Sequence, residues 1–283
     1  MERVKITECP RDAMQGISEF IPTEQKIAYI NTLLKVGFDT LDFGSFVSPR
    51  AIPQLSDTAQ VIAGLDLTQT NTKLLAIVAS KKGGEMAASH PEVTYLGYPF
   101  SFSETFLLKN INKTVEQGHE LTKQFLDICE TQDKQLLLYL TMAFGNPYGD
   151  VWHEDQIYKW VDKASHLGIT KITLSDITGE STPELIHKVY SRLIKSYPQI
   201  DFGIHLHTTH TSAQDKVNSA LKAGCRSFDT VLNDKGGCPM TGKELTANLN
   251  TFDFVKYTEQ KNINNNIDKS LLKQAYKQAS SLF

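Results

Sequence analysis

Two histidines separated by one residue, His205 and His207, are the strongest chemical signal in the sequence. In a strand, residues two apart point to the same face, so both imidazoles could reach one metal ion. Asp12 follows another predicted strand, and a carboxylate beside two imidazoles suits Mg²⁺ or Mn²⁺ with positions left for an oxygen-rich substrate. No cysteine stands beside the histidine pair, which disfavours a structural zinc site. The residues therefore favour a divalent-cation site over a simple hydrogen-bonded histidine pair.

A second pair of residues, Arg11 and Asp42, could stabilise developing negative charge. Asp42 lies in the apolar run Thr40–Phe46, and a carboxylate buried there needs a partner. Arg11 could supply it, and a guanidinium that is always charged is suited to stabilising an oxyanion. A surface ion pair between Arg11 and its neighbour Asp12 is the plainer alternative, and the sequence alone leaves both open.

The cysteines indicate a chain with free thiols and one reactive candidate. Four cysteines in 283 residues, with no C-x-x-C pair, are too few for a disulfide framework, so we expect an intracellular, cytoplasmic chain. Cys238 lies in the segment Gly236-Gly237-Cys238-Pro239, after the eighth predicted strand. A thiol on such a loop could act as a general acid or base if its pKa is tuned. The alternative is a turn with an incidental cysteine.

Short β-rich runs that alternate with helical runs must position these residues. The strand candidates are Val4–Cys9, Thr40–Phe46, Leu74–Ala79, Val93–Tyr98, Gln135–Thr141, Lys171–Ser175, Phe202–His207 and Ser227–Leu232. The helix candidates are one capped by Thr23, one capped by Asn112, and His153–Leu167, Pro183–Ser196, Thr211–Ala223, Leu245–Glu259 and Asp268–Leu282. This alternation predicts an α/β fold, a TIM (β/α)8 barrel with an extra C-terminal helical segment. An open doubly wound sheet is the alternative, disfavoured because no G-x-G-x-x-G follows the first strand.

A barrel would bring the candidate residues together. Catalytic residues of such barrels lie at the carboxyl ends of the strands. The first predicted strand leads into Asp12, the sixth ends at Asp176, and the seventh carries the histidine pair. Ionisable groups therefore gather at one end of a predicted single domain that spans residues 1–283.

The composition excludes several functions. The 29 basic and 32 acidic residues give a net charge of −3, which argues against nucleic-acid binding. No run of about 18 apolar residues occurs, so we expect no transmembrane helix and no membrane partner. Residues 1–10 lack the apolar core of a signal peptide.

Seven segments spread over almost the whole chain carry a family resemblance. They are Cys9–Gln15, Gly44–Arg50 with Ile52–Gln54, Lys109–Asn112, Gly145–Tyr148, Leu174–Gly179, His205–His207 and Gly236–Met240. In content and order they make the chain similar to the 3-hydroxy-3-methylglutaryl-CoA lyases of the DRE-TIM metallolyase superfamily. The Ser-Phe-Val-Ser-Pro run and the Gly-Gly-Cys-Pro loop are specific to the lyases, whereas Arg-Asp and His-x-His are shared with related synthases.

The resemblance implies a role for each matching residue. The divalent cation, Mg²⁺ or Mn²⁺, would be held by Asp12, His205, His207 and Asn248. The catalytic residues would be Arg11, Asp42, Asp176, His205 and Cys238, and the substrate would also contact Gln15, Ser45 and Asn110. Arg11 would polarise the thioester carbonyl and stabilise the acetyl-CoA enolate, while Cys238 would lie on a mobile loop that closes over the site. Asp42 stands where the family usually has Glu.

The implied reaction is the metal-dependent cleavage of 3-hydroxy-3-methylglutaryl-CoA, or a similar 3-hydroxyacyl-CoA, to acetyl-CoA and acetoacetate. His205 or Asp176 would remove the proton of the tertiary hydroxyl, and Cys238 or a water would return a proton to carbon. The resemblance also implies an acyl-CoA thioester as partner, allows a homodimer, and is consistent with leucine degradation.

Departures from the family pattern leave the substrate and two alternatives open. Gly16-Ile17-Ser18 replaces the usual Asn-Glu-Lys, which removes a lysine that could meet CoA phosphates, and Thr208 replaces an Asp. One alternative is a related aldolase or Claisen-type condensing enzyme. The other is a barrel without catalysis that binds a metal.

Overall fold

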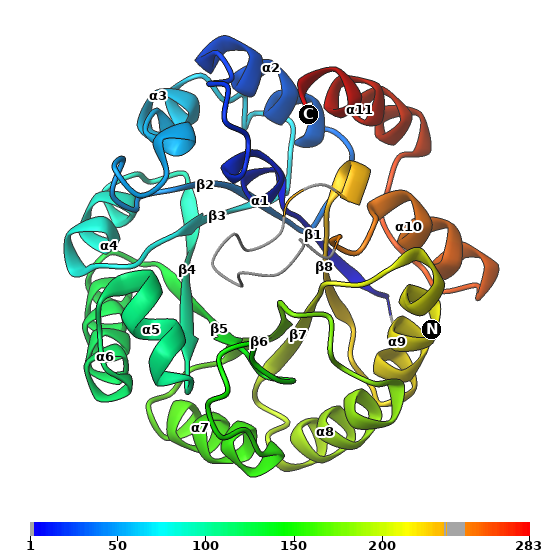
Figure 1. Cartoon of the computed structure of the whole chain (residues 1–283). Coiled ribbons are helices and arrows are strands. Elements are labelled where there is room, and N and C mark those ends of the chain that lie inside the picture. Colours follow the sequence, from blue (N-terminus) through cyan, green and yellow to red (C-terminus); the bar gives the residue numbers. More distant parts are fainter. Residues whose placement is uncertain (1–2, 235, 237–246) are drawn as a thin grey trace.

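Eight parallel strands form a closed barrel in the part of the chain that the structure describes, which is residues 3–234, 236 and 247–283 of this computed structural model (Figure 1). The strands are β1 (Lys5–Glu8), β2 (Thr40–Ser45), β3 (Lys73–Ile77), β4 (Val93–Ser101), β5 (Gln135–Thr141), β6 (Lys171–Asp176), β7 (Asp201–Leu206) and β8 (Ser227–Thr230). They are hydrogen-bonded in chain order, and β1 closes the ring by pairing with β8. The predicted TIM barrel is confirmed, and the open doubly wound sheet is wrong.

Most of the helices surround the barrel on its outer side, whereas the short helix of residues 10–15 lies over β1 and β2 near the barrel mouth (Figure 1). The helices are α1 (Pro10–Gln15), α2 (Thr23–Leu33), α3 (Thr58–Ala63), α4 (Lys81–Ala88), α5 (Glu104–Ile111), α6 (Val115–Thr131), α7 (Glu154–His166), α8 (Pro183–Ser196), α9 (His210–Lys222), α10 (Thr251–Gln260) and α11 (Lys269–Leu282), with short 3-10 turns η1 (Pro53–Leu55) and η2 (Leu232–Asp234). The last of them, α11, is the predicted extra C-terminal segment, and it lies beside α2 with the Phe283 ring 5.6 Å from that of Tyr29. Among the described residues, no helix is both long and apolar enough to cross a membrane.

The apolar core has two layers because each strand has two buried faces. The outward faces of the strands pack against the helices in one large cluster. A second, smaller cluster of Leu75, Ile77, Leu137 and Tyr139 joins β3 and β5 inside the barrel. Strands buried on both sides are expected to be nearly continuous apolar runs, and β5, with the sequence Gln-Leu-Leu-Leu-Tyr-Leu-Thr, fits this pattern. The core therefore fixes the barrel, and polar side chains are left for its two ends.

Two predicted helix starts were wrong for a local reason. Thr23 is the first residue of α2 and Pro22 precedes it as the cap. Asn112 does not cap α6; it ends α5 in a left-handed conformation with φ 51°. Thr114 caps α6 instead, in a reciprocal capping box with Gln117, which satisfies two backbone donors that Asn112 could not reach.

The start of α10 affects the candidate site directly, because residues 247–250 precede the helix and include Asn248. The predicted helix began at Leu245, but α10 begins at Thr251 and is capped by Asn250, whose side chain accepts from the amide of Asp253. Leu249 donates its amide to Leu206 O, so residues 247–250 run along the end of β7 rather than in a helix. This backbone pairing competes successfully with helix formation and carries Asn248 to the barrel axis.

Candidate active site and metal centre

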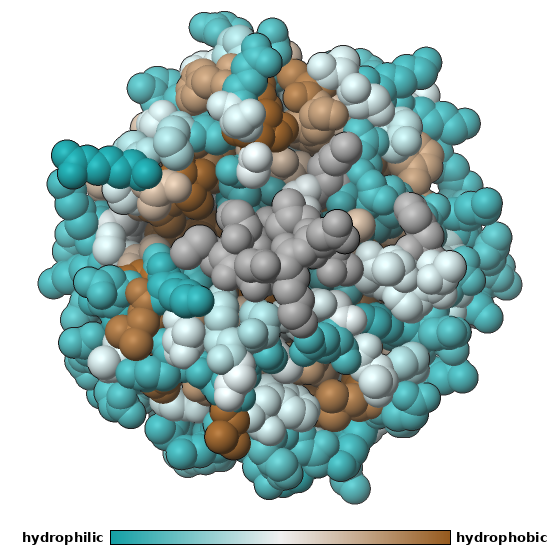
Figure 2. Space-filling view, in the orientation of Figure 1, coloured by the Kyte–Doolittle hydropathy of each residue, from teal (hydrophilic) through white to brown (hydrophobic). Residues whose placement is uncertain are grey.

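The candidate residues gather where the strands end and the βα loops begin. Asp12 lies in α1, which starts immediately after β1 with Pro10 in its first turn, a position where proline is favoured. Asp42 is in β2 and Asp176 ends β6. In the space-filling view of this end, hydrophobic patches lie between the barrel mouth and α3 to α5, whereas the outer rim is mostly hydrophilic (Figure 2). Apolar patches thus flank part of the barrel mouth at the end where the candidate residues gather.

Asp12, His205 and His207 form one buried group. One ligand atom from each residue lies within 4.8 Å of the others. The Nε2 atoms of the two histidines are 3.3 Å apart, and His205 Nε2 is 4.0 Å from Asp12 Oδ2. His207 lies one residue beyond β7, not within the strand as predicted, and forms an isolated bridge with Asn248. Asn248 Nδ2 donates to Asp12 Oδ2 at 2.9 Å, so all four predicted ligands meet.

The group fits a divalent cation. Two imidazole nitrogens, a carboxylate and an amide are a donor set suited to Mg²⁺ or Mn²⁺. Although burial opposes ionisation of Asp12, the charges of Arg11 and the two histidines hold its pKa below the ordinary value. Gly236 approaches from the loop with φ 96°, and a Cβ there would lie 2.7 Å from Asp12 O. Only glycine lets the loop pass this close to the candidate ligands.

His205 is oriented by Asp229, a residue that the sequence analysis missed. Asp229 Oδ2 lies 3.2 Å from His205 Nδ1, so His205 can donate its Nδ1 proton to Asp229. The other ring nitrogen, Nε2, then faces Asp12 and is available as a metal ligand. Burial disfavours the charged ring, but the hydrogen bond and charge of Asp229 outweigh it and raise the pKa of His205. Asp229 is a carboxylate in the buried strand β8, directly after Phe228, so it needs a partner for the same physical reason as Asp42.

A second cluster, Cys9 with His205 and Asp229, has atoms close enough to hold an ion but the wrong chemistry. Burial, together with the charges of Asp229 and Asp42, raises the pKa of the Cys9 thiol well above its ordinary value. A protonated thiol is a poor ligand, since the thiolate is the form that binds metal. Of the two clusters, the one that contains Asp12 is therefore the better candidate for a cation site.

Arg11 and Asp42 meet, as the buried carboxylate of β2 required. Arg11 donates from Nε and Nη2 to Asp42 Oδ2, at 3.0 and 2.6 Å, and from Nη1 to Asp12 Oδ1 at 3.2 Å and Gln15 Oε1 at 3.0 Å. Burial raises the pKa of Asp42 to about 6 although Arg11 opposes this. Burial also disfavours the charged guanidinium, but the two aspartates outweigh it and raise the pKa of Arg11. Arg11 is thus a fixed positive charge next to the candidate ligands.

Asp176 is held by an unpredicted buried lysine. Its Oδ2 accepts from Lys216 Nζ at 3.0 Å and from the amide of Ser181 at 3.1 Å, and Lys216 also donates to Gly179 O at 2.9 Å. Its Oδ1 is buried and makes no hydrogen bond within the described ranges. Lys216 comes from α9, a polar helix whose sequence gives no sign that one lysine points inward. One carboxylate oxygen is thus committed to the ion pair and the other is not.

The remaining predicted residues lie apart from this centre or outside the described residues. Ser45 is buried, donates its hydroxyl to Ile77 O at 3.2 Å and so ties the end of β2 to β3. Asn110 lies in α5 and donates to Phe106 O of the same helix at 2.8 Å. Cys238 lies outside the described residues. Among the described residues, neither Ser45 nor Asn110 forms a hydrogen bond with a candidate metal ligand.

A closed βα barrel with a carboxylate–histidine cluster at the carboxyl ends of its strands defines a class of barrel proteins with a candidate metal site, and comparisons with known proteins narrow this class. The chain belongs to the HMGL-like family, whose model matches residues 3–278. It is 30% identical to the hydroxymethylglutaryl-CoA lyase of Bacillus subtilis over 98% of this chain and 92% of that protein. It is 28% identical to the human mitochondrial hydroxymethylglutaryl-CoA lyase, over 97% of this chain and 84% of the human protein.

Solved structures agree in fold. The crystal structure of the Bacillus subtilis HMG-CoA lyase has a TM-score of 0.92 and covers 99% of this chain and 93% of its own. An HMG-CoA lyase from Acinetobacter baumannii, solved with coenzyme A and 3-methylmalate, has a TM-score of 0.91 at 29% identity. That match covers 99% of this chain and 91% of the other.

Proposed function

We propose that this chain is a divalent-metal-dependent carbon–carbon lyase that cleaves 3-hydroxy-3-methylglutaryl-CoA, or a closely similar 3-hydroxyacyl-CoA, to acetyl-CoA and acetoacetate. The observation that carries this proposal is the buried cluster of Asp12, His205 and His207 with the fixed charge of Arg11 beside it. The lyase names of the relatives, and the coenzyme A bound to one of them, support the substrate class. One catalytic domain over residues 1–283 would carry the whole reaction.

Asp12, His205, His207 and Asn248 would hold the cation, Mg²⁺ or Mn²⁺. When bound, it supplies positive charge that polarises substrate oxygens and eases loss of a hydroxyl proton. Asp229 keeps the His205 ring in the orientation this requires. The site as a whole is thus built by residues from α1, the end of β7, β8 and the segment before α10.

Asp176 is our candidate for the group that accepts the hydroxyl proton. Its Oδ2 is taken by Lys216 and Ser181, but its buried Oδ1 has no hydrogen-bond partner within the described residues. His205 is the poorer candidate because one ring nitrogen faces Asp229 and the other faces the metal ligands. Loss of the hydroxyl proton forms the new ketone as the C2–C3 bond breaks, and the bonding electron pair passes to the thioester as an enolate.

Arg11 would stabilise the enolate oxygen. Asp42 fixes the Nε and Nη2 side of the guanidinium, and Gln15 and Asp12 fix the Nη1 side, so no reorganisation is needed as charge develops. The guanidinium is mostly buried, which strengthens its interaction with an oxyanion over the same contact in water. Cys238, or a water, would then return a proton to the C2 carbon.

The test is product formation by the purified protein with 3-hydroxy-3-methylglutaryl-CoA and Mg²⁺ or Mn²⁺. We expect metal-dependent acetoacetate, and a fall in kcat of about 10²–10³-fold in Arg11→Met because an oxyanion-stabilising group is lost. Arg192→Met, at an exposed arginine of α8 outside the candidate site, is the matched control and should keep the wild-type rate.

The other outcomes would identify the alternatives. Release of free CoA from acetyl-CoA and a keto acid would favour a Claisen-type enzyme. Metal binding without any turnover of hydroxyacyl-CoA thioesters would favour a barrel that has lost catalysis.

A further inference from the structure

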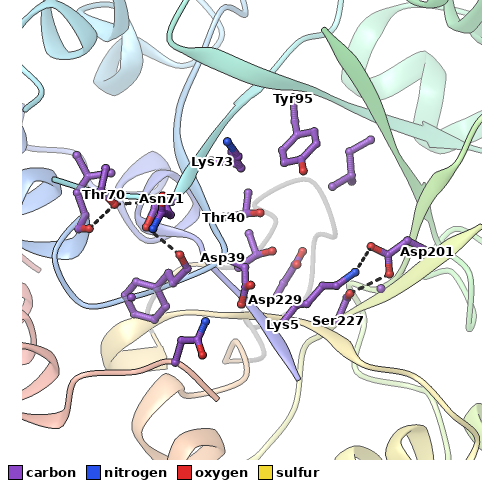
Figure 3. A pocket seen from close by; sticks show the side chains of 18 of the residues that line it. Lys5, Asp39, Thr40, Thr70, Asn71, Lys73, Tyr95, Asp201, Ser227 and Asp229 are labelled. Atoms are coloured by element: carbon purple, nitrogen blue, oxygen red, sulfur yellow. Dashed lines mark hydrogen bonds and ion pairs between the residues drawn. The ribbon is translucent and has the colours of Figure 1, made fainter. Parts of the chain in front are cut away.

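A cavity of about 560 Å³ lies at the amino-terminal end of the barrel, opposite the candidate metal centre (Figure 3). Its wall is built from residues at the starts of the strands: Lys5, Thr40, Lys73, Lys171, Asp201 and Ser227. Cavities of about 300–1,000 Å³ are the size that proteins use for small organic molecules. No step proposed for the lyase reaction uses this end of the barrel.

The charges of the cavity do not cancel. Five basic and three acidic side chains line it. Asp201 Oδ2 is shared between Lys5 and Lys171, at 2.7 and 2.9 Å. Asp39 pairs with Arg3 at 2.6 Å. The third aspartate, at the inner end of the cavity, is the one that faces His205 and is compensated there. The outer part of the cavity therefore carries surplus positive charge.

Lys73 supplies part of this surplus positive charge, on a different side of the cavity from Lys5 and Lys171. It begins β3, and the described part of the chain gives it no ion pair. Figure 3 shows Lys73 beside Thr40 and Tyr95, whereas Lys5 approaches Asp201 from another side of the cavity. Positive charge thus reaches the same space from two separated positions. The hydroxyls of Thr40 and Tyr95 add hydrogen-bonding groups between them.

We propose that this cavity binds a small organic dianion with two separated acidic groups, of the dicarboxylate type. One carboxylate would meet Lys73 and the other would meet Lys5 and Lys171, which already share a single carboxylate. A monocarboxylate could satisfy only one side. A water molecule occupies about 30 Å³ in the liquid. The cavity, at about 560 Å³, is therefore much larger than a compact tetrahedral ion needs.

Calorimetric titration of the metal-loaded wild-type protein at low ionic strength tests this binding. The probes are succinate, acetate as the matched monocarboxylate, and inorganic phosphate as the compact ion. Succinate should bind at least about tenfold more tightly than acetate, with affinity that falls as salt screens the lysines. Phosphate binding as tightly as succinate would overturn the assignment to a ligand with two separated groups.

Variants locate the site. Lys73→Ala should weaken succinate binding about five- to tenfold, whereas Lys222→Ala, at an exposed lysine of α9 outside the cavity, should leave it unchanged. Equal succinate affinity in Lys73→Ala and wild type would overturn the proposal. So would loss of succinate binding in Arg11→Met, because that would place the ion at the carboxyl-terminal end.

Chemical labelling provides a second readout that depends on neither a variant nor turnover. Acetylation of lysines, followed by peptide mass spectrometry, should show that succinate protects Lys73 and Lys5 but not Lys222. Equal labelling of Lys73 with and without saturating succinate would overturn the proposal. Because this measurement requires no lyase activity, its failure is distinguishable from failure of the proposed reaction.

Discussion

The two ends of the barrel use the same types of charged residue under different exposure to water. At the carboxyl-terminal end, Arg11 contacts Asp42, whose side chain is fully buried. At the amino-terminal end, the Lys5 and Asp201 side chains are 47% and 30% exposed. A buried charge left without its partner costs about 3–5 kcal/mol, whereas an exposed ion pair contributes about 0–1 kcal/mol. Substitutions at the two ends should therefore differ in size even when the chemistry removed is the same.

The largest difference should follow from neutralising one aspartate at each end. Asp12→Asn removes the negative charge from the candidate metal ligands and should lower Mn²⁺ affinity more than about 100-fold. This loss exceeds the roughly 10–100-fold loss in metal affinity that is typical when a residue that only orients a ligand is replaced. Asp39→Asn keeps an acceptor for the Ile6 amide and should leave Mn²⁺ affinity unchanged. Equilibrium titration of both variants with Mn²⁺ measures this. Equal losses in the two variants would remove Asp12 from the ligand set.

Replacing one lysine at each end compares buried with exposed ion pairs. Lys216→Met leaves Asp176 buried without its cation and should lower the free energy of unfolding by about 3–5 kcal/mol. Lys5→Met leaves Asp201 paired with Lys171 and should cost less than about 1 kcal/mol. Urea denaturation followed by circular dichroism gives both values. A loss below about 1 kcal/mol in Lys216→Met would contradict the account of the buried pair.

Asp229 lies between the two ends and should affect metal binding by an intermediate amount. Asp229→Asn keeps the size of the side chain but weakens the acceptor for His205 Nδ1, so Mn²⁺ affinity should fall about 10–100-fold. The midpoint of succinate binding at the amino-terminal end should shift far less. Unchanged Mn²⁺ affinity would show that His205 does not need this partner.

A separate effect concerns pH and Glu8, at the end of β1. Burial raises the pKa of the Glu8 carboxyl from 4.5 to about 8, although hydrogen bonds from Thr251, Leu232 and Thr230 oppose this. Between these two values the folded chain binds more protons at Glu8 than the unfolded chain, so this group makes stability fall as pH rises from about 5 to 8. Glu8→Gln should flatten the dependence of the unfolding free energy on pH over that interval. A slope identical to that of the wild type would contradict the raised pKa.

The sequence predicts the barrel and much of the arrangement at its carboxyl-terminal end. Strand alternation places Asp12 after β1 and His205 near the end of β7. These two strands flank β8, and all three present their carboxyl ends on one side of the barrel. Asp42 is predicted to need a partner from burial alone, and Arg11 meets it. These are the features that follow from strand periodicity and the cost of burying charge.

Other features depend on long-range packing and have no local signal. Lys216 is one of several polar residues in α9, and only its contacts with Asp176 and Gly179, far away in the sequence, identify it as a buried partner. Asn248 reaches Asp12 because residues 247–250 pair with the end of β7, where a helix was predicted, and α10 begins only at Thr251. The surplus charge around Lys73 becomes visible only when strand starts far apart in sequence meet around one cavity.

Metal-dependent cleavage at the carboxyl-terminal end is the central claim, and one titration tests it most directly. Metal-stripped protein is mixed with 3-hydroxy-3-methylglutaryl-CoA, and acetoacetate formation is followed as Mn²⁺ is added. The account predicts no product without metal and a rate that saturates near one Mn²⁺ per chain. A rate that is independent of Mn²⁺, or no acetoacetate at saturating Mn²⁺, would contradict it.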